Sequence, residues 1–412
     1  MFLQSTCLFS FGSCCHHVNH INSLKVYASR FKIKEKTCNI ACMLLRKLRC
    51  YHFKNYDSIE LSFATQLNCI VGANGAGKTN LLDAIHYLSL TKSAFNSIDS
   101  QNILHGGTQM SIQGHFFKND KSYDVKCIVD RDQGKSLQVN GKAYKTMREH
   151  IGQFPIVLTT PYDTELIRST SEVRRKFFDA ILCQIDPNYL HTLIQYQQIL
   201  KHRNSFLKMS AGKFNVDRAL INSYDTQLLP LCKQLYAARK AFVDIFYPIL
   251  QQQYEYFVDA PEIIEMGYES DADDPGFEQR FLDNIKEDLL AQRTILGIHR
   301  DDYVFMLNNY PIKKFGSQGQ QKSFIIALRL AQFACIHQAL GCKPLLLLDD
   351  IFDKLDEQRI ERLVYLMAQQ YFGQVWITDA GGKRSASILK EIQADKALFK
   401  IEGGTLMQNI VL

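Results

Sequence analysis

Eight consecutive residues in the first quarter of the chain are of the right types and spacing to bind a phosphate group. They fit the pattern G-x-x-x-x-G-K-[ST]. Glycine lets the backbone wrap closely around an anion, so that successive N–H groups point toward it. We expect Lys78 to reach the β- and γ-phosphates of ATP and the Thr79 hydroxyl to bind Mg²⁺. The predicted nucleotide-binding residues of this loop are Gly72, Ala73, Asn74, Gly75, Ala76, Gly77, Lys78 and Thr79.

The residues on both sides of this loop predict the local structure that such a loop needs. Leu67–Val71 is a short apolar run and predicts a buried strand. Leu81, Leu82, Ile85 and Leu88 recur at helical spacing, so a helix should begin directly after the loop. The helix would direct the positive end of its dipole at the anion. This context favours a phosphate-binding loop over a chance glycine turn.

A second group of candidate residues follows another apolar run. Leu345–Leu348 predicts a buried strand, and Asp349 and Asp350 come directly after it. A carboxylate at the end of a strand beside the phosphate loop can help to hold Mg²⁺, and its neighbour can orient or activate the attacking water. The predicted catalytic residues are therefore Lys78, Asp349 and Asp350, and the predicted metal ligands are Thr79 and Asp349. The alternative is an ordinary core strand that ends in acidic loop residues.

The separation of the two groups limits the class of protein. Asp349 lies 271 residues after Lys78. Small GTPases and nucleotide kinases are much more compact, and the Asn-Lys-x-Asp motif that reads a guanine base is absent from the sequence. A large segment must therefore be inserted between the two halves of the nucleotide site.

The inserted segment contains a third candidate anion site. The loop SQGQQ begins at Ser317 and precedes an apolar helix predicted over Lys322–Leu340. It resembles the Ser-Gly-Gly-Gln signature of ABC-type ATPases, with Ser317, Gly319 and Gln320 in matching places. This resemblance implies that the loop of one subunit contacts the γ-phosphate held by another. A simple N-capped turn is the alternative.

Several further motifs occur in one order along the chain. They are IVGANGAGKTNLLDAIHYLSL, TPYD from Thr160, RRKFFD from Arg174, GIHRDD from Gly297, FGSQGQQKS from Phe315 and LLLLDDIFDKLDEQR from Leu345. With these motifs, the sequence from Met43 nearly to its end resembles the RecF family of bacterial DNA-repair ATPases. The resemblance implies an ATP-dependent homodimer that clamps DNA at junctions of single and double strands. It also implies a role in recombinational repair, in which the protein assists RecO and RecR in loading RecA.

The sequence departs from the pattern of this family at three places. Ile298 stands where the family has proline, and Lys354 where it often has glutamate, although Asp356 is retained. Thr378 occupies the position of the usual switch histidine after the next strand. We therefore expect weak sensing of the γ-phosphate and slow hydrolysis, with the nucleotide acting as a dimerisation switch.

The expected architecture is α/β, namely a P-loop NTPase of the ABC/SMC-head type with an inserted helical lobe. Residues 43–165 and 343–412 would form the ATPase lobe, and residues 166–342 a mainly helical lobe that carries the signature loop. Helical patterns dominate from Glu165 to Arg293, broken by an acidic loop over Glu269–Gly276. Residues 1–42 are expected to be an extension outside the fold or the product of a misassigned start.

Composition adds little to this assignment. The net charge is +6, but the first 42 residues contain five of the cations and one carboxylate, so charge alone supports DNA binding only weakly. The cysteines lack zinc-site spacing and a disulfide framework, as expected for the cytoplasm. The longest apolar runs are too short to cross a bilayer.

Three other groups of residues are open to two readings. Residues 299–302, His-Arg-Asp-Asp, could be a metal or acid–base cluster or a turn held by ion pairs. Residues 174–176 and 201–203 are basic and could contact DNA phosphates or form solvated helix faces. Tyr51, Phe53 and Tyr56 could stack on adenine or belong to the core.

Three rival functions remain open at this stage. The first is an ATP-binding switch with negligible hydrolysis. The second is the ATPase subunit of a transporter, which the 271-residue separation disfavours. The third is a structural head of SMC type, which would need long heptad repeats on either side of the lobe, and these are absent.

Overall fold

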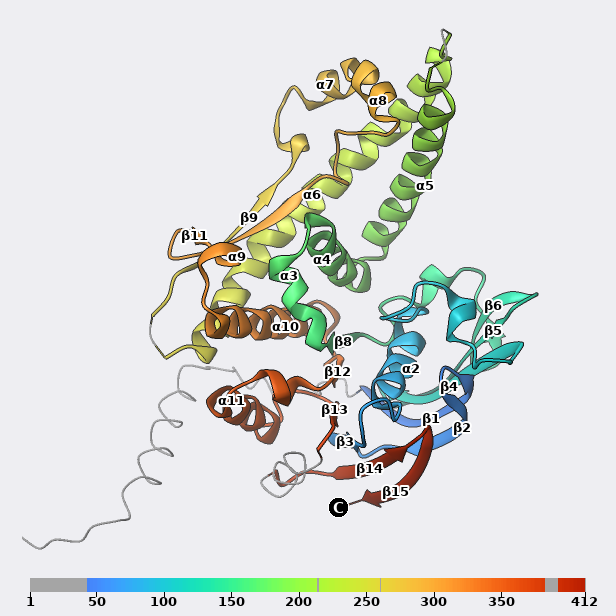
Figure 1. The fold of residues 1–412 in the computed structure, drawn as a ribbon, viewed down its shortest axis with the longest axis vertical. Helices are drawn as coiled ribbons and strands as arrows, with labels where there is room; N and C mark the ends of the chain where they lie inside the picture. The colour runs from blue at the N-terminus through green and yellow to red at the C-terminus, as the bar shows by residue number, and fades with distance from the viewer. Residues whose placement is uncertain (1–42, 213–214, 260, 382–391, 412) are drawn as a thin grey trace, which may run out of the picture. The chain divides into compact units, whose positions relative to one another are not determined.

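A computed structural model describes residues 43–212, 215–259, 261–381 and 392–411. These residues all lie within one compact unit, Ala41–Leu412 (Figure 1). The expectation for residues 1–42 lies outside the described residues.

The centre of the ATPase region is a mixed sheet in which four neighbouring strand pairs run parallel. Its order is β15 (Thr405–Val411), β14 (Lys396–Glu402), β3 (Leu67–Val71), β13 (Val375–Asp379), β12 (Leu345–Leu348) and β8 (Ile156–Thr159). Every residue of β12 and β8 is buried, as expected for parallel strands covered on both faces. Because parallel strands end at the same edge, the residues that follow β3, β12 and β13 meet there.

A second, antiparallel sheet packs beside the first. Its order is β2 (Tyr56–Ser62), β1 (Met43–Phe53), β4 (Gln109–Lys118), β5 (Lys121–Asp130), β6 (Gly134–Val139) and β7 (Lys142–Ala143). Buried and more exposed residues alternate along β4 and β5, as expected for an antiparallel sheet with one face against the core. Helix α2 (Lys78–Leu90) buries Leu81, Ile85 and Leu88 in a core shared by both sheets.

The middle of the chain forms the helices that the sequence predicts. The two longest, α5 (Pro187–Met209) and α6 (Arg218–Phe257), pack against each other (Figure 1). The other helices here are α3 (Glu165–Arg168), α4 (Ser171–Ile185), α7 (Phe277–Asp283), α8 (Ile285–Ala291), α9 (Ile312–Phe315) and α10 (Gln318–Leu340). Helix α11 (Glu357–Ala368) follows β12. Short 3₁₀ turns cover Asp99–Asn102, Met147–His150, Pro161–Thr164, Asp271–Asp273 and Ile351–Lys354.

One element of this region differs from the prediction. A three-stranded sheet of order β11 (Tyr310–Pro311), β10 (Asp302–Leu307) and β9 (Ile264–Glu269) lies among the helices. Strand β9 falls within Glu165–Arg293, the stretch in which helices are expected. Strand β9 forms because it pairs with β10 along its whole length, and only the folded chain supplies that partner.

Helix α10 is long and apolar enough to cross a membrane by length and composition alone. However, 72% of its most apolar window is buried within the protein. It packs against α6, α4 and β8, which is the environment of a core helix.

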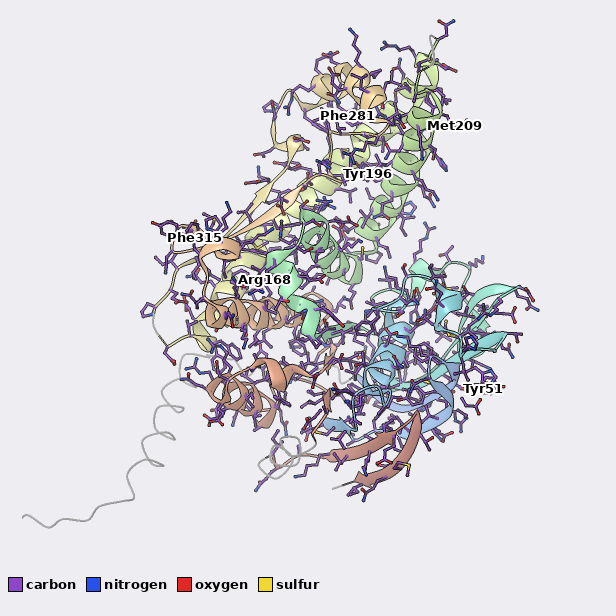
Figure 2. All side chains as sticks on the ribbon, in the orientation of Figure 1. Tyr51, Arg168, Tyr196, Met209, Phe281 and Phe315 are labelled. Carbon is purple, nitrogen blue, oxygen red and sulfur yellow. The ribbon has the colours of Figure 1, made fainter. Side chains whose placement is uncertain are left out.

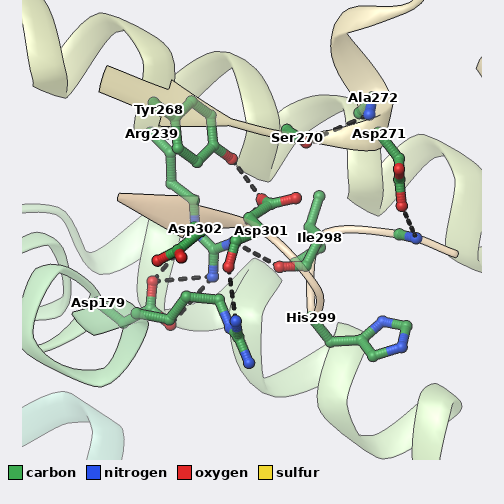
Figure 3. A network of polar contacts seen from close by, with 12 residues as sticks. Asp179, Arg239, Tyr268, Ser270, Asp271, Ala272, Ile298, His299, Asp301 and Asp302 are labelled. Atoms are coloured by element: carbon green, nitrogen blue, oxygen red, sulfur yellow. Dashed lines mark hydrogen bonds and ion pairs between the residues drawn. The ribbon is translucent and has the colours of Figure 1, made fainter. Parts of the chain in front are cut away.

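A buried arginine holds three parts of the helical region together (Figure 3). Arg239 of α6 donates to both carboxylate oxygens of Asp179 at 3.0 Å and to Asp301 Oδ2 at 2.8 Å. It also donates to the carbonyl oxygen of Ile298 at 2.8 Å. The network connects α4, α6 and the turn before β10, and its guanidinium is almost completely buried.

We expect Arg239→Met to lower the free energy of unfolding by about 3–5 kcal/mol, because the Asp179 and Asp301 carboxylates would lose their buried counterion. Urea unfolding followed by circular dichroism measures this change. The matched control is Lys233→Met, since Lys233 lies on the same helix but forms an exposed ion pair with Glu278, and it should change stability little. Equal losses in the two variants would contradict a structural role for the network.

Candidate nucleotide-binding site

The loop between β3 and α2 has the geometry of an anion-binding loop. Gly75 and Gly77 have φ angles of 80° and 114°, a region that favours glycine. A Cβ on Gly72 would lie 2.2 Å from the carbonyl oxygen of Ile401, so only glycine fits there. Within the described residues, the backbone N–H groups of Asn74, Gly75 and Gly77 have no hydrogen-bond acceptor. These donors are available to a phosphate.

Residues from two distant hairpins support the loop. The Tyr56 hydroxyl donates to the carbonyl oxygen of Gly77 at 2.9 Å, and Asn55 Nδ2 donates to that of Ala76 at 3.2 Å. The N–H of Gly404, between β14 and β15, also donates to the Ala76 carbonyl, at 3.0 Å. Tyr56 is fully buried, and its burial raises the pKa of the hydroxyl, which stays a donor. The core reading of Tyr56 is therefore correct, but its contact with the loop was not predictable.

Phe53 and Tyr51, the other two aromatic residues that could stack on adenine, also lie outside the phosphate-binding cavity. Phe53 is fully buried in the core, which confirms the core reading for it. Tyr51 is 44% exposed and stacks on the ring of His52, with centroids 3.9 Å apart. Neither residue lines the phosphate cavity described below.

Lys78 lies over the phosphate loop. Its Nζ donates to the carbonyl oxygens of Gly72 and Ala73, at 2.8 and 3.1 Å. The side chain is nearly buried, so the ammonium group is held at the centre of the loop. Its positive charge acts on the carboxylate of Asp349, which follows β12.

The carboxylate of Asp349 accepts hydrogen bonds from two hydroxyl groups. Thr79 Oγ1 donates to it, with distances of 2.9 and 3.0 Å to the two carboxylate oxygens, and Thr378 Oγ1 lies 2.8 Å from Oδ1. Burial raises the pKa of Asp349, and the hydrogen bonds from Thr378 and Thr79 and the charge of Lys78 act against that rise. A buried carboxylate next to a hydroxyl group is a hard-oxygen donor set, which suits Mg²⁺.

The donor set is small, however. The described ranges contain no group of three or more His, Cys, Asp and Glu residues that could hold a metal ion by themselves. Mg²⁺ is typically bound by one or two protein groups together with substrate phosphates and water. Thr79 and Asp349 fit that pattern rather than a dedicated protein cage.

Asp350 is the second acidic residue at this edge. Its backbone has φ 48° and ψ 36°, and its N–H donates to Thr378 Oγ1 at 2.9 Å. Thr378 thus holds Asp349 and Asp350 in place by one hydroxyl group, a role that the sequence pattern did not reveal. The left-handed turn directs the chain away from the end of β12.

These residues surround one cavity of about 190 Å³. Residues 271 positions apart in the sequence therefore meet, because β3, β13 and β12 are neighbours in the sheet. The cavity is lined by Asn74, Gly75, Gly77, Lys78, Thr79, Asn80, Asp349, Asp350 and Thr378. Its backbone N–H donors and the side-chain oxygens of Thr79 and Asp349 suit a nucleoside triphosphate with Mg²⁺.

The predicted signature loop does not line this cavity. Ser317 caps α10, since its Oγ accepts from the N–H of Gln320 at 3.2 Å and the Gln320 side chain accepts from the Ser317 N–H. Arg359 donates to the Gly319 carbonyl at 3.2 Å, and Gln320 donates to Glu262 at 2.7 Å. Ser317 is exposed, and so is the ring of Phe315 two residues before it, which is labelled in Figure 2.

The cluster at residues 299–302 is a turn held by ion pairs. Asp301 is paired with Arg239, and Asp302 accepts two hydrogen bonds from Arg174, at 2.7 and 2.8 Å. Burial lowers the pKa of His299 to about 4, so its ring is neutral at ordinary pH. This arrangement supports the ion-pair reading over an acid–base or metal cluster.

Two of the six basic residues considered as DNA contacts are engaged inside the fold. Arg174 is bound to Asp302 as described above. Arg203 is fully buried between Asp225 and Asp288, at 2.7 and 2.6 Å. The burial of Arg203 argues against a DNA contact by this residue, whereas Arg174 is half-buried and its charge is paired with Asp302.

The chain is similar to proteins of DNA repair over most of its length. Residues 44–381 match the family model for the RecF/RecN/SMC N-terminal domain. The chain is 42% identical to the DNA replication and repair protein RecF of Cytophaga hutchinsonii, with 89% of this chain and 97% of that protein covered. It is 41% identical to RecF of Flavobacterium johnsoniae, with 87% and 100% covered.

Solved structures give the same result. The structure of the recombination mediator protein RecF-ATP in the RecFOR pathway matches with a TM-score of 0.81 and 26% identity, covering 90% of this chain and 98% of that one. An Smc head domain from Pyrococcus yayanosii matches with a TM-score of 0.51 and 13% identity, covering 90% and 97%, which supports the fold alone. The α/β fold is therefore that of an ABC/SMC-type ATPase head, and the chain belongs to the RecF family of DNA replication and repair proteins.

Proposed function

We propose that this protein binds ATP and Mg²⁺, dimerises in response, and clamps DNA during recombinational repair in the cytoplasm. The observation that carries the proposal is the separation of its two anion-binding loops. The cavity around Lys78 and Asp349 is lined by the expected ligands Asn74, Gly75, Gly77, Lys78, Thr79, Asp349 and Asp350. The expected loop residues Gly72, Ala73 and Ala76 do not line it, and neither do the residues of the Ser317 loop.

The phosphate loop supports the assignment of ATP. Lys78 would exchange the carbonyl oxygens of Gly72 and Ala73 for phosphate oxygens, and the free N–H groups of Asn74 and Gly75 would donate to the same anion. Bound Mg²⁺ would neutralise phosphate charge. Thr79 and Asp349 would hold it, and the buried Asp349 carboxylate, on which the charge of Lys78 already acts, would gain a directly bound cation.

A second copy of the chain would complete the site. The Ser317 loop is exposed at the start of a 23-residue helix, and a helix N-terminus is a ready anion site. Each ATP would be bound by Lys78 and Thr79 of one subunit and by Ser317, Gly319 and Gln320 of the other. In this proposal residues 43–165 and 343–412 act as the ATPase lobe, and residues 166–342 as the lobe that presents the signature loop.

The hydrogen bonds of Thr378 are a reason to expect that the protein hydrolyses ATP slowly. The single hydrogen of the Thr378 hydroxyl is donated to Asp349, and the oxygen also accepts from the Asp350 N–H. It is therefore occupied in positioning the two acids and is not available as a γ-phosphate sensor. Asp350 would orient the attacking water, so a weak, DNA-stimulated ATPase activity is expected.

The role in a pathway rests on the relatives. Two are named as DNA replication and repair proteins, and a solved relative is described as a recombination mediator of the RecFOR pathway. By this relationship, the proposed partners are gapped or junction DNA, RecO and RecR, and the proposed outcome is loading of RecA.

The central experiment is to measure the mass of the protein by light scattering, with and without Mg-ATP and a gapped DNA duplex. A dimer should form only with Mg-ATP, since ATP would bridge the two subunits, and gapped DNA should stabilise it. Chelation of Mg²⁺ serves as the control and should return the protein to monomers. If the protein stays monomeric with Mg-ATP, the proposal that it clamps DNA as an ATP-dependent dimer is wrong.

Asp350→Asn should slow ATP hydrolysis by about 10²-fold or more, because an amide cannot accept a proton from water. Binding of ATP should persist, so the dimer should stay closed and DNA should dissociate more slowly in a competitor-chase measurement. Glu361→Gln is the matched control, as this exposed residue of α11 lies outside the cavity. Release of DNA from Asp350→Asn at the wild-type rate would rule out the switch.

A complementation assay tests the composite site. Lys78→Ala removes the phosphate-binding amine, whereas Ser317→Asp keeps an N-cap but places a carboxylate against the partner's phosphate. Each variant alone should lack ATPase activity. A mixture should regain part of it, because every mixed dimer contains one site with both loops intact. If the mixture stays as inactive as the two variants, the loops do not act across subunits.

A further inference from the structure

A basic groove runs along one side of helix α5, away from the nucleotide cavity. It consists of two adjoining hollows of about 390 and 440 Å³, which share Gln197, Leu200 and Asn204 as lining residues. The groove extends along α5 from the level of Tyr196 toward the end of the helix near Met209, both labelled in Figure 2. None of its lining residues belongs to the phosphate loop or the signature loop.

Positive charge dominates the lining of this groove. Its two carboxylates are already paired, Glu172 with Lys176 at 2.7 Å and Asp179 with Arg239 at 3.0 Å. Five further cations line the groove, and none of them has an ion-pair partner in the part of the chain that the structure describes. They are Arg175, Lys201, Lys208, Arg293 and Arg300.

The cations come from three elements that the fold brings together. Lys201 and Lys208 lie on one face of α5 with Gln197, Asn204 and Ser205, at positions that recur with the helical period. Arg293 and Arg300 lie before β10, in the turns that follow α8. Arg175 is on α4, where its guanidinium donates to Ser171 and to the carbonyl oxygen of Asp301.

The ion-pair network of Figure 3 explains why these groups stay available. Asp179 lines the groove and Asp301 lies buried beside it, but Arg239 compensates both carboxylates. His299 also lines the groove, and burial lowers its pKa to about 4, so it adds no charge at neutral pH. The buried carboxylates therefore do not draw the surface arginines inward.

We infer that this groove binds the phosphodiester backbone of DNA. This inference rests on the proposed function and places its DNA contact within a single subunit. The face of α5 from Gln197 to Lys208 is about 16 Å long at 1.5 Å per residue. One strand of a duplex advances one phosphate per about 3.4 Å of axis, so the groove can face several phosphates of one strand. Amides at Gln197 and Asn204 add uncharged donors between the cations.

The chemistry favours a backbone contact over base reading. Lysines and arginines that line an open groove neutralise phosphates and release counterions, with little regard to sequence. Of the two basic sequence segments considered as DNA contacts, Arg175, Lys176 and Lys201 line the groove. Arg174 and Arg203 do not line it and are paired with carboxylates of the protein.

The experiment measures binding of a fluorescent duplex with a single-stranded gap, by anisotropy over a range of salt concentrations, to the full chain with Mg-ATP. The test variant is Lys201→Ala/Lys208→Ala/Arg293→Ala, which changes only exposed side chains. Its affinity should fall at every salt concentration, and the negative slope of log K against log salt should move toward zero by about one for each phosphate that is no longer neutralised. The variant Lys201→Arg/Lys208→Arg/Arg293→Lys should keep the wild-type slope.

The matched control is Lys121→Ala/Lys142→Ala/Lys145→Ala, which removes three exposed lysines in or next to the antiparallel sheet that lie outside the groove. If the triple-alanine variant of the groove has the affinity and slope of the wild type, the groove does not bind the DNA backbone, although the proposed function stays intact. An equal loss in the control would also overturn the inference, since the effect would then be one of overall charge. A triple-alanine variant that loses affinity only for polyglutamate, and not for DNA, would assign the groove to an acidic protein instead.

Two accompanying measurements separate the inference from the proposed function. Mg-ATP binding and ATP-dependent dimerisation of the triple-alanine variant should equal those of the wild type, because the groove shares no residue with the nucleotide cavity. Failure of the wild type to bind DNA under any condition would overturn both claims. Failure of the wild type to dimerise, with groove-dependent DNA binding intact, would overturn the clamp alone.

Discussion

The hydrogen bonds from Thr79 and Thr378 to the carboxylate of Asp349 are the interaction on which the rest of the structure depends. They join the helix after β3 to the ends of β12 and β13, so they form only if these strands are neighbours and parallel. A buried carboxylate is costly, and the hydroxyl donors and the nearby charge of Lys78 reduce that cost only in part. The sheet therefore holds a charge that a bound cation would stabilise. The insertion of a whole helical region between β8 and β12 is compatible with this interaction, because the two strands that flank the insertion are adjacent and parallel in the sheet.

Sequence reasoning succeeded where the determining interactions are local. The phosphate loop, α2, β12 and the acidic pair after it all follow from short patterns of glycine, apolar spacing and charge. It failed where a residue's role depends on a distant partner. Strand β9 exists because β10 pairs with it, and Tyr56 supports the loop because the β1–β2 hairpin packs against Gly77.

The burial of charged residues is also difficult to predict from the sequence, because it depends on distant partners. Arg203 and Lys201 lie two positions apart in one basic segment, yet one is fully buried and the other exposed. Helical geometry alone separates them onto different faces, but only the carboxylates of Asp225 and Asp288 make burial of a guanidinium tolerable. Those partners come from other helices. A basic segment of the sequence therefore does not show which of its residues form buried ion pairs and which lie on the surface.

The position of the signature loop within the chain argues for a site shared between subunits. Helix α10 is tied to the ATPase region at several points, through the ion pair of Arg329 with Asp163 and the hydrogen bonds of Arg359 to Gly319 and Ser323. Asp163 follows β8, whose Thr159 carbonyl accepts the N–H of Asp349. A hinge movement that brought Ser317 into its own phosphate cavity would have to break these buried or half-buried interactions, and each charge left without its partner would cost more than an exposed ion pair returns. A second copy of the chain can supply the same loop without breaking any of them. In the proposed dimer, this restraint on α10 within one subunit would leave the signature loop available only to the nucleotide of a partner subunit.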